Sequence, residues 1–289
     1  MQRKQLHANG PVFSRIISGA WRWNLPETTV HALIESSLAC GITTFDHADI
    51  YGDHNNEAIF GNILRKDPSL RRKMELVTKC GIKFPSAHRP ASWVKHYDTS
   101  KEHIRWSAEN SLKTLATDYI DLLLIHRPDP LLNPEEVAGA FTALKQSGKV
   151  LHFGVSNFTP AQFEMLQSYL SFPLVTNQIE ISLATHAPMF DGSLDILMKH
   201  RVAPMAWSPL GGGKLLKDDA AVFSKAGKYA ATQTQMALAW LLKHPSGIFP
   251  VIGTTKPDRI RESADAINIQ LDLQDWFEML KIVQGKEMP

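Results

Sequence analysis

Short apolar runs alternate with amphipathic segments along almost the whole chain. Residues 120–125 are apolar on both faces, which is typical of a buried parallel strand. Similar strand-like runs occur at residues 16–19, 43–46, 74–79, 152–157, 175–180, 203–207 and 248–252. Between these runs, apolar residues recur at helical spacing, as at Val30, Leu33 and Leu38 within residues 28–40.

Several predicted helices have recognisable first and last residues. Residues 99–102 and 159–162 have the spacing of capping boxes, in which a Thr hydroxyl accepts from a backbone N–H of the first turn. Asn133-Pro134 predicts another helix start, and Gly148 predicts the end of that helix. Further helices are expected at residues 56–64, 104–115, 194–200, 234–244, 257–267 and 271–283.

Eight alternations of strand and helix predict a (β/α)8 TIM barrel, an α/β fold. No linker or change of composition divides the chain, so we expect a single domain spanning residues 1–289. The Asn9-Gly10 turn signal predicts an N-terminal β-hairpin, and residues 271–283 predict an extra C-terminal helix. The alternative is an open doubly wound sheet, but no strand–turn–helix segment carries its glycine fingerprint or a P-loop.

Residues 82–98 are too long for an ordinary connection, so we predict an irregular loop with a functional role there. The loop includes Trp93 and Tyr97, two aromatic side chains that could face a bound small molecule.

Composition narrows the class of protein without identifying it. The formal net charge of +2 gives no global field for nucleic acid or a membrane surface, so neither is an expected partner. The sequence lacks an apolar run long enough to span a membrane, and it lacks a basic-then-apolar leader. These two observations predict a cytoplasmic protein. The two cysteines are too few for a disulfide framework or a Cys-rich zinc site, and we expect no metal.

Polar and aromatic side chains stand at the ends of nearly all the predicted strands. In a barrel of this kind the active site lies at the C-terminal ends of the strands. Taken singly, each residue has an ordinary explanation: Asp46 could cap a turn, and His126 could be a hydrogen-bonded buried histidine. The strand ends carry, in chain order, Trp21, Asp46 with Tyr51, Lys79, His126, Ser156-Asn157, Gln178, Trp207-Ser208 and Thr254 to Arg259.

Four of these residues together form a coherent acid–base set. A Tyr phenol has a pKa of about 10 and donates a proton poorly at neutral pH unless it is tuned. The Lys79 ammonium would lower the pKa of Tyr51, and the Asp46 carboxylate would hold Lys79 in place. His126 within hydrogen-bond reach would orient a carbonyl oxygen. This set is suited to protonating the alkoxide that develops when a nicotinamide or flavin cofactor delivers hydride to a carbonyl.

Other strand ends carry groups that suit a dinucleotide. Ser156, Asn157 and Gln178 offer the hydrogen bonds that a carboxamide needs, and Trp207 offers a ring for stacking. The glycine run at 211–213 would let backbone N–H groups approach a pyrophosphate.

The last strand end has the features of an anion site. Pro257 stands at the first position of a helix, with Lys256 just outside it and Arg259 on its first turn. A helix N-terminus with two cations suits a 2′-phosphate, although a solvated helix end would look the same in sequence.

At this point the chain resembles the aldo-keto reductase superfamily over essentially its whole length. It is most similar to a bacterial oxidoreductase branch that shares His-Arg-Pro-Asp and Trp-Ser-Pro-Leu with the potassium-channel β subunits. The matching segments, in order, are Phe45-Asp46-x-Ala48-Asp49-x-Tyr51-Gly52, Ile120-Asp121-Leu122-x-Leu124-x-His126-Arg127-Pro128-Asp129, Gly148-Lys149-Val150-x-x-x-Gly154-Val155-Ser156-Asn157-Phe158, Trp207-Ser208-Pro209-Leu210 and Arg259-Ile260-x-Glu262.

The resemblance implies a monomeric barrel that reduces a small-molecule aldehyde or ketone with NADP(H) in preference to NAD(H). It places the catalytic tetrad on Asp46, Tyr51, Lys79 and His126, with Tyr51 as the general acid. Together with the long loop at 82–98, it leads us to expect a substrate pocket that includes Trp21, Trp93 and Arg127. It assigns cofactor contacts to Gly19, Ala20, Trp21, Ser156, Asn157, Gln178, Trp207, Ser208, Leu210, Gly211, Gly213, Gly253, Thr254, Lys256, Arg259, Glu262 and Ser263.

The chain also departs from the family pattern. Gly253 stands where many members carry a basic residue, so a 2′-phosphate would depend on Lys256 and Arg259. Ser263 stands where members often have Asn. Arg127 stands where several carbonyl-reducing members place an aromatic residue, which predicts a more polar pocket suited to an anionic substrate.

Two other functions remain open from the sequence. A cofactor-sensing regulatory subunit with little turnover would retain the same tetrad. A Schiff-base lyase would use Lys79 as its nucleophile, but it would leave Tyr51 and Trp207 without a role.

Overall fold

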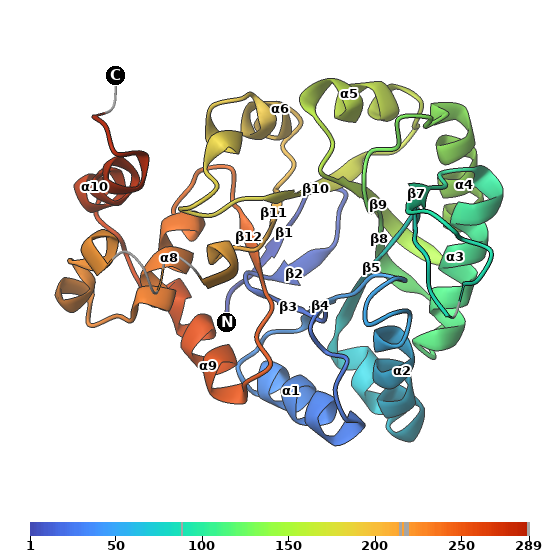
Figure 1. Cartoon of the computed structure of the whole chain (residues 1–289), viewed down its shortest axis with the longest axis horizontal. Coiled ribbons are helices and arrows are strands. Elements are labelled where there is room, and N and C mark those ends of the chain that lie inside the picture. The colour runs from blue at the N-terminus through green and yellow to red at the C-terminus, as the bar shows by residue number, and fades with distance from the viewer. Residues whose placement is uncertain (88, 214–215, 217–219, 288–289) are drawn as a thin grey trace.

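The computed structural model describes residues 1–87, 89–213, 216 and 220–287. At its centre is a closed barrel of eight parallel strands, whose order around the barrel follows the chain (Figure 1). The barrel strands are β3 (Ile17–Gly19), β4 (Thr44–Asp46), β5 (Glu75–Cys80), β8 (Ile120–Ile125), β9 (Val150–Ser156), β10 (Leu174–Glu180), β11 (Met205–Trp207) and β12 (Phe249–Ile252).

Helices surround the strands as an outer ring (Figure 1). The α-helices are α1 (Glu27–Ala39), α2 (Asn56–Lys66), α3 (Lys101–Thr114), α4 (Pro134–Gln146), α5 (Pro160–Ser168), α6 (Ser193–Lys199), α8 (Gln233–Leu242), α9 (Pro257–Asp265) and α10 (Leu273–Gln284). Short 3-10 helices are η1 (Pro68–Lys73), η2 (Ala187–Met189), η3 (Gly211–Gly213), η4 (Ala220–Phe223), η5 (Ala226–Tyr229) and η6 (Ala266–Asn268). None of the described helices is both long and apolar enough to cross a membrane.

The predicted barrel is confirmed, and the open sheet is excluded because β12 pairs with β3 to close the ring. The caps at Asn133 and Thr159 also form as predicted. The capping box at residues 99–102 is wrong by one position. Ser100 is the N-cap of α3 and accepts from the backbone N–H of His103 at 3.2 Å. The Thr99 hydroxyl instead donates to the carboxylate of Asp129 at 2.8 Å.

The predicted N-terminal hairpin closes one end of the barrel. Its strands β1 (Arg3–Gln5) and β2 (Val12–Ser14) pair antiparallel. Leu6 and Phe13 are fully buried and pack with Val175, Met205 and Phe249, which lie at or near the beginnings of barrel strands. The hairpin therefore covers the N-terminal end and leaves the strand C-termini free for chemistry.

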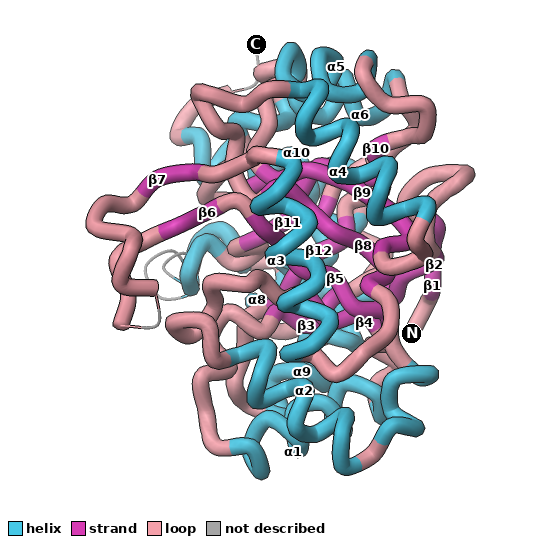
Figure 2. Tube along the Cα trace, turned by 90° about the vertical axis from the view of Figure 1, so that its right-hand side faces the viewer, coloured by secondary structure: helices cyan, strands magenta, loops and turns pink. Residues whose placement is uncertain are grey.

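The long segment 82–98, described at residues 82–87 and 89–98, is not irregular at its ends. Its ends form a small antiparallel pair, β6 (Ile82–Lys83) with β7 (His96–Tyr97). Figure 2 shows this pair and the β1–β2 hairpin at opposite ends of the barrel. The Phe84 ring stacks on His54 with centroids 5.3 Å apart. The segment is thus attached to the loop that follows β4.

A cluster of buried aromatic rings fixes the position of β4. The Phe45 ring lies 5.4 Å from Phe60 of α2 and 6.2 Å from Trp23, and all three side chains are almost completely buried. Burying each such side chain stabilises the fold by roughly 1.5–3 kcal/mol. This packing places the next residue, Asp46, at the open end of the barrel.

Two helical glycines give a matched test of the packing. A Cβ on Gly61 of α2 would lie 1.8 Å from the carbonyl oxygen of Thr114, whereas a Cβ on Gly139 of α4 would meet only the flexible end of Lys101 at 3.4 Å. We expect Gly61→Ala to destabilise the protein by roughly 2 kcal/mol or more. Gly139→Ala should stabilise it by about 0.5–1 kcal/mol. Urea unfolding measures both changes, and midpoints that move in the same direction would contradict this account of the α2–α3 contact.

Candidate active site

A buried lysine lies at the centre of the site. Lys79, near the end of β5, is 1% exposed, and its Nζ donates to Asp46 Oδ2 at 2.7 Å, the His47 carbonyl at 2.8 Å and the Tyr51 hydroxyl at 3.1 Å. Burial alone would lower the pKa of Lys79, but the charges and hydrogen bonds of Asp46 and Tyr51 outweigh it and raise that pKa. All three N–H donors of a charged ammonium therefore have partners.

Asp46 is held on both of its oxygens. One oxygen pairs with Lys79, and the other accepts from Gln178 Nε2 at 2.9 Å. A buried ion pair is favourable only when its geometry is good and its remaining hydrogen-bonding positions are filled. Gln178, which lies on β10 across the barrel, donates the hydrogen bond that the second Asp46 oxygen needs.

The third hydrogen-bond partner of Lys79 is the Tyr51 phenol. Because an ammonium only donates, the Tyr51 oxygen accepts from Lys79 and its own O–H is left to donate elsewhere. Burial raises the pKa of Tyr51 by more than Lys79 lowers it, so the net direction is upward, opposite to the tuning expected from sequence. Tyr51 therefore keeps its proton throughout the neutral range.

His126 lies beside the phenol, with its ring edge-on to Tyr51 at a centroid distance of 5.8 Å. Burial, followed by the charges of Lys79, Arg127 and Lys95, lowers the pKa of His126 well below its ordinary value. The imidazole is therefore neutral. Its Nδ1 is buried without a hydrogen-bond partner among the described residues.

The predicted carboxamide contacts form one hydrogen-bonded group. Ser156 Oγ donates to the Gln178 carbonyl at 2.8 Å, and Asn157 Nδ2 donates to Ser156 Oγ at 2.8 Å. Trp207 Nε1 in turn donates to Asn157 Oδ1 at 2.9 Å. Asn157 has a φ of 59°, a left-handed conformation that Asn adopts more readily than most residues. These bonds fix the Trp207 ring relative to β9 and β10.

The glycine run after β11 is a tight turn. Gly211, Gly212 and Gly213 all have positive φ, as does Ser208 before them. The Gly211 N–H donates to the Ser208 carbonyl and the Gly213 N–H to that of Leu210, each at 2.8 Å. These two N–H groups are thus satisfied within the turn, so their predicted pyrophosphate contacts gain no support from the geometry.

The residues predicted to bind the adenosine phosphate lie on and before α9. Lys256 and Arg259 are exposed and form no ion pair within 4.0 Å with any residue that the structure describes. Glu262 accepts from the Thr232 hydroxyl at 2.6 Å, and Ser263 is only 3% exposed. The two cations are available to a ligand, whereas Ser263 faces the interior.

The remaining predicted residues divide between the interior and the surface. Gly19 and Ala20 are buried, and a Cβ on Gly19 would lie 2.9 Å from the Val251 side chain. Trp21 and Trp93 are 60% and 86% exposed. Gly253 and Thr254 are partly exposed directly after β12.

One buried acid near the site, Asp49, is not among the predicted site residues. Asp49 Oδ2 accepts from Ser107 at 2.7 Å, and its backbone N–H donates to the Lys79 carbonyl at 3.1 Å. Burial raises the pKa of Asp49 to about 8. Asp49 therefore attaches the Tyr51 loop to β5 and α3 as a neutral carboxylic acid, and no sequence signal distinguishes it from a surface carboxylate.

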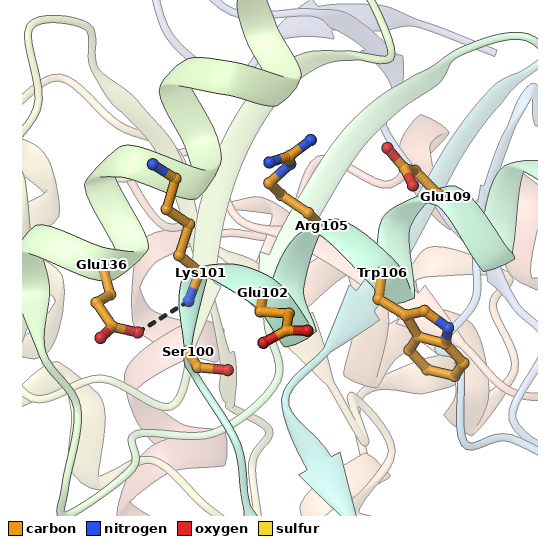
Figure 3. A pocket seen from close by; sticks show the side chains of 7 residues that line it. All are labelled: Ser100, Lys101, Glu102, Arg105, Trp106, Glu109 and Glu136. Atoms are coloured by element: carbon orange, nitrogen blue, oxygen red, sulfur yellow. Dashed lines mark hydrogen bonds between the residues drawn. The ribbon is translucent and has the colours of Figure 1, made fainter.

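A hollow of about 640 Å³ lies away from this site, on the outer helical shell. Figure 3 shows side chains of α3 around it, with the Lys101 N–H bonded to Glu136 at 3.0 Å. Its lining is mixed polar and charged, and it includes none of the tetrad. Within the described part of the chain, no cluster of three or more His, Cys, Asp or Glu side chains could hold a metal ion.

A Tyr phenol supported by a buried Lys–Asp pair, beside a neutral His at the strand C-termini, defines a (β/α)8 barrel enzyme equipped for proton transfer. Comparison with known proteins then gives the family. Residues 15–284 match the model of the Aldo/keto reductase family, and the chain belongs to that family of oxidoreductases.

Three relatives illustrate the similarity. The chain is 50% identical over 301 residues to the uncharacterized oxidoreductase YcsN of Bacillus subtilis, covering all of both chains. It is 49% identical over 284 residues to a 6-dehydroglucose reductase of Agrobacterium fabrum, covering 95% of this chain and 96% of that one. Among solved structures, a thermostable aldo-keto reductase in complex with the inhibitor epalrestat matches with a TM-score of 0.85 and 26% identity, covering 98% of this chain and 100% of that one.

The raised pKa of Asp49 predicts a pH dependence of stability. Its folded-state pKa of about 8 lies above the ordinary 3.8, so the native state holds a proton that the unfolded state releases between these values. The contribution of Asp49 to the free energy of unfolding is therefore greatest below about pH 4. It falls by up to roughly 5 kcal/mol as the pH rises to about 8. Asp49→Asn removes the titration and keeps an oxygen for Ser107.

We expect Asp49→Asn to lose less stability than the wild type between pH 5 and pH 8. Urea unfolding at pH 5, 6.5 and 8 measures this difference. Ser107→Ala is the control, because it removes the hydrogen bond without removing the carboxyl group. An identical pH slope in wild type and Asp49→Asn would show that Asp49 is not a buried neutral acid.

Proposed function

We propose that this protein is an NADP(H)-dependent reductase that converts a small aldehyde or ketone into an alcohol. The observation that carries the proposal is the arrangement around Lys79. Its three donors are all in use, so Tyr51 accepts from it and has one proton to give. That proton is held beside a neutral histidine at the open end of the barrel.

The chain's own groups perform the acid half of the reaction. The nicotinamide, when bound, supplies hydride to the carbonyl carbon. The Tyr51 O–H then transfers its proton to the carbonyl oxygen, and the Lys79 ammonium stabilises the phenolate that remains. Asp46 and Gln178 keep Lys79 in position. The neutral His126 ring can donate one N–H to the same oxygen and so orient the carbonyl.

The residues present suit a nicotinamide dinucleotide. The Trp207 ring is held by Asn157, and Ser156, Asn157 and Gln178 stand together on adjacent strands. Lys256 and Arg259 would bind the 2′-phosphate at the start of α9, which supports NADP(H) over NAD(H). We assign the cofactor and substrate contacts as predicted from sequence, with those of Gly211, Gly213 and Ser263 the least supported by the geometry.

The substrate we propose is a small hydroxylated aldehyde. A relative with 49% identity is named 6-dehydroglucose reductase, and Arg127 adds a polar group beside His126. We also propose that residues 1–289 form one domain that acts as a cytoplasmic monomer. The relation to the potassium-channel β subunits is likewise our inference from the two shared segments, and no contact in the structure favours a regulatory role over turnover.

The lyase alternative is disfavoured by the state of Lys79. A Schiff-base lysine must be neutral and free to attack, whereas Lys79 has a raised pKa and three hydrogen-bond partners. Borohydride trapping of a carbonyl substrate on Lys79 would reverse this conclusion.

The first test removes the proton donor. Tyr51→Phe should lower kcat for carbonyl reduction by roughly 10²–10⁴-fold, because general acid catalysis contributes about that much. NADPH binding, followed by quenching of tryptophan fluorescence, should change by less than about threefold, because the phenol is not proposed to hold the cofactor. Full activity of Tyr51→Phe, or no binding of NADPH by the wild type, would contradict the proposed function.

The second test concerns the choice of cofactor. Lys256→Ala and Arg259→Ala should each weaken NADPH binding by about 10-fold, because each removes a charge-assisted contact with the 2′-phosphate. NADH lacks that phosphate, so its dissociation constant should be unchanged. Arg261→Ala, on the same helix but paired with Asp258, is the matched control. An equal loss of affinity for NADPH and NADH would show that the two cations do not act through the 2′-phosphate.

A further inference from the structure

Arg127 lies at the C-terminal end of the barrel, two residues after β8. It follows His126 directly, and its guanidinium lies 5.3 Å from the centre of the Trp207 ring. Trp207 is itself fixed by its hydrogen bond to Asn157. A cation over an indole ring is stabilised by roughly 0.5–2 kcal/mol. This contact holds the Arg127 side chain, which starts just after β8, over the Trp207 ring at the end of β11.

The charged groups that shift the pKa of His126 are all positive. Three cations act on its pKa in the same direction, namely Lys79, Arg127 and Lys95. The charge of Lys79 is neutralised by Asp46 at 2.7 Å. Within the described chain, neither Arg127 nor Lys95 lies within 4.0 Å of a carboxylate oxygen. The charges of Arg127 and Lys95 are therefore not neutralised by an ion pair with a described residue.

The cation–π contact alone does not satisfy Arg127. A guanidinium has five N–H donors in a planar fork, which matches the geometry of a carboxylate or a phosphate. Arg127 is half-buried, and no hydrogen bond from it to a described residue is seen. Partly desolvated donors without acceptors are costly, so an oxygen-rich ligand would be favoured there.

Lys95 offers a second cation from a different element. It lies on the segment between β6 and β7, is exposed, and its charge reaches His126. Arg127 and Lys95 therefore both add positive charge in the neighbourhood of His126.

We propose that Arg127 binds an anionic group of the carbonyl substrate, a carboxylate or a phosphate. This inference rests on the proposed function and adds one feature to the substrate proposed there, namely a negative charge. Arg127 is a specificity residue in this view, and Tyr51 remains the acid. The cations proposed to bind the cofactor phosphate, Lys256 and Arg259, lie after a different strand.

Matched pairs of substrates test the anion site. The first pair is glyceraldehyde 3-phosphate against glyceraldehyde, and the second is 4-carboxybenzaldehyde against benzaldehyde, each with NADPH. We expect the wild type to prefer the charged member of each pair, with a kcat/KM that falls as salt is added. Arg127→Met keeps apolar contact with Trp207 but removes the charge. It should lower kcat/KM for the charged members by about 10- to 100-fold, mainly through KM, and for the neutral members by less than about threefold.

Two further variants complete the design. Arg127→Lys should recover part of the preference, because it restores the charge without the planar fork. Arg105→Met, on the outer face of α3, should have no effect on either member. Equal losses on charged and neutral aldehydes in Arg127→Met, or a wild-type preference for the neutral members, would overturn the anion site while leaving the reductase intact. If the wild type reduces none of the four compounds with NADPH, the proposed function itself is overturned.

Discussion

The structure depends on one buried ammonium group. Moving a lysine from water into a protein interior costs several kcal/mol unless the charge is paired and every donor is bonded. Lys79 meets both conditions through Asp46, the His47 carbonyl and Tyr51. All three partners lie at the end of β4 or in the loop that follows it. Strand pairing, loop conformation and the ionised pair therefore require one another, and loss of any one leaves a buried charge uncompensated.

The same ammonium connects the acid to the opposite side of the barrel. Asp46 is bonded to Gln178 of β10, whose carbonyl accepts from Ser156 of β9. Asn157 and Trp207 continue these bonds to β11. Polar groups joined in this way rigidify a site, since a shift of one member would leave buried neighbours unbonded. The network supports the proposal that the groups assigned to the nicotinamide and to the proton form one rigid unit.

The sequence was sufficient for the architecture and for choosing four residues that the structure brings together, but not for their electrostatics. The strands follow from periodicity and the hairpin from the Asn9-Gly10 turn signal, and both are local properties of the sequence. The cap of α3 was misplaced because Thr99 and Ser100 can both cap a helix, and a distant acceptor, Asp129, binds Thr99. Lys79 lowers the pKa of Tyr51 as predicted, but burial raises it by more, and burial is set by the whole fold. The contact of Asp46 with Gln178 joins residues 132 positions apart, and no spacing rule indicates it.

The charge around His126 also decides which group can act as the acid. A protonated imidazole would be the stronger donor, and it would compete with Tyr51 for that role. Burial and three neighbouring cations disfavour protonation of His126 at neutral pH. Tyr51, by contrast, is protonated and accepts from Lys79, which would stabilise its conjugate base. Burial and the neighbouring cations together disfavour a proton on the histidine, which supports the proposal that the phenol donates it, and the cations other than Lys79 support the inference of an anionic ligand.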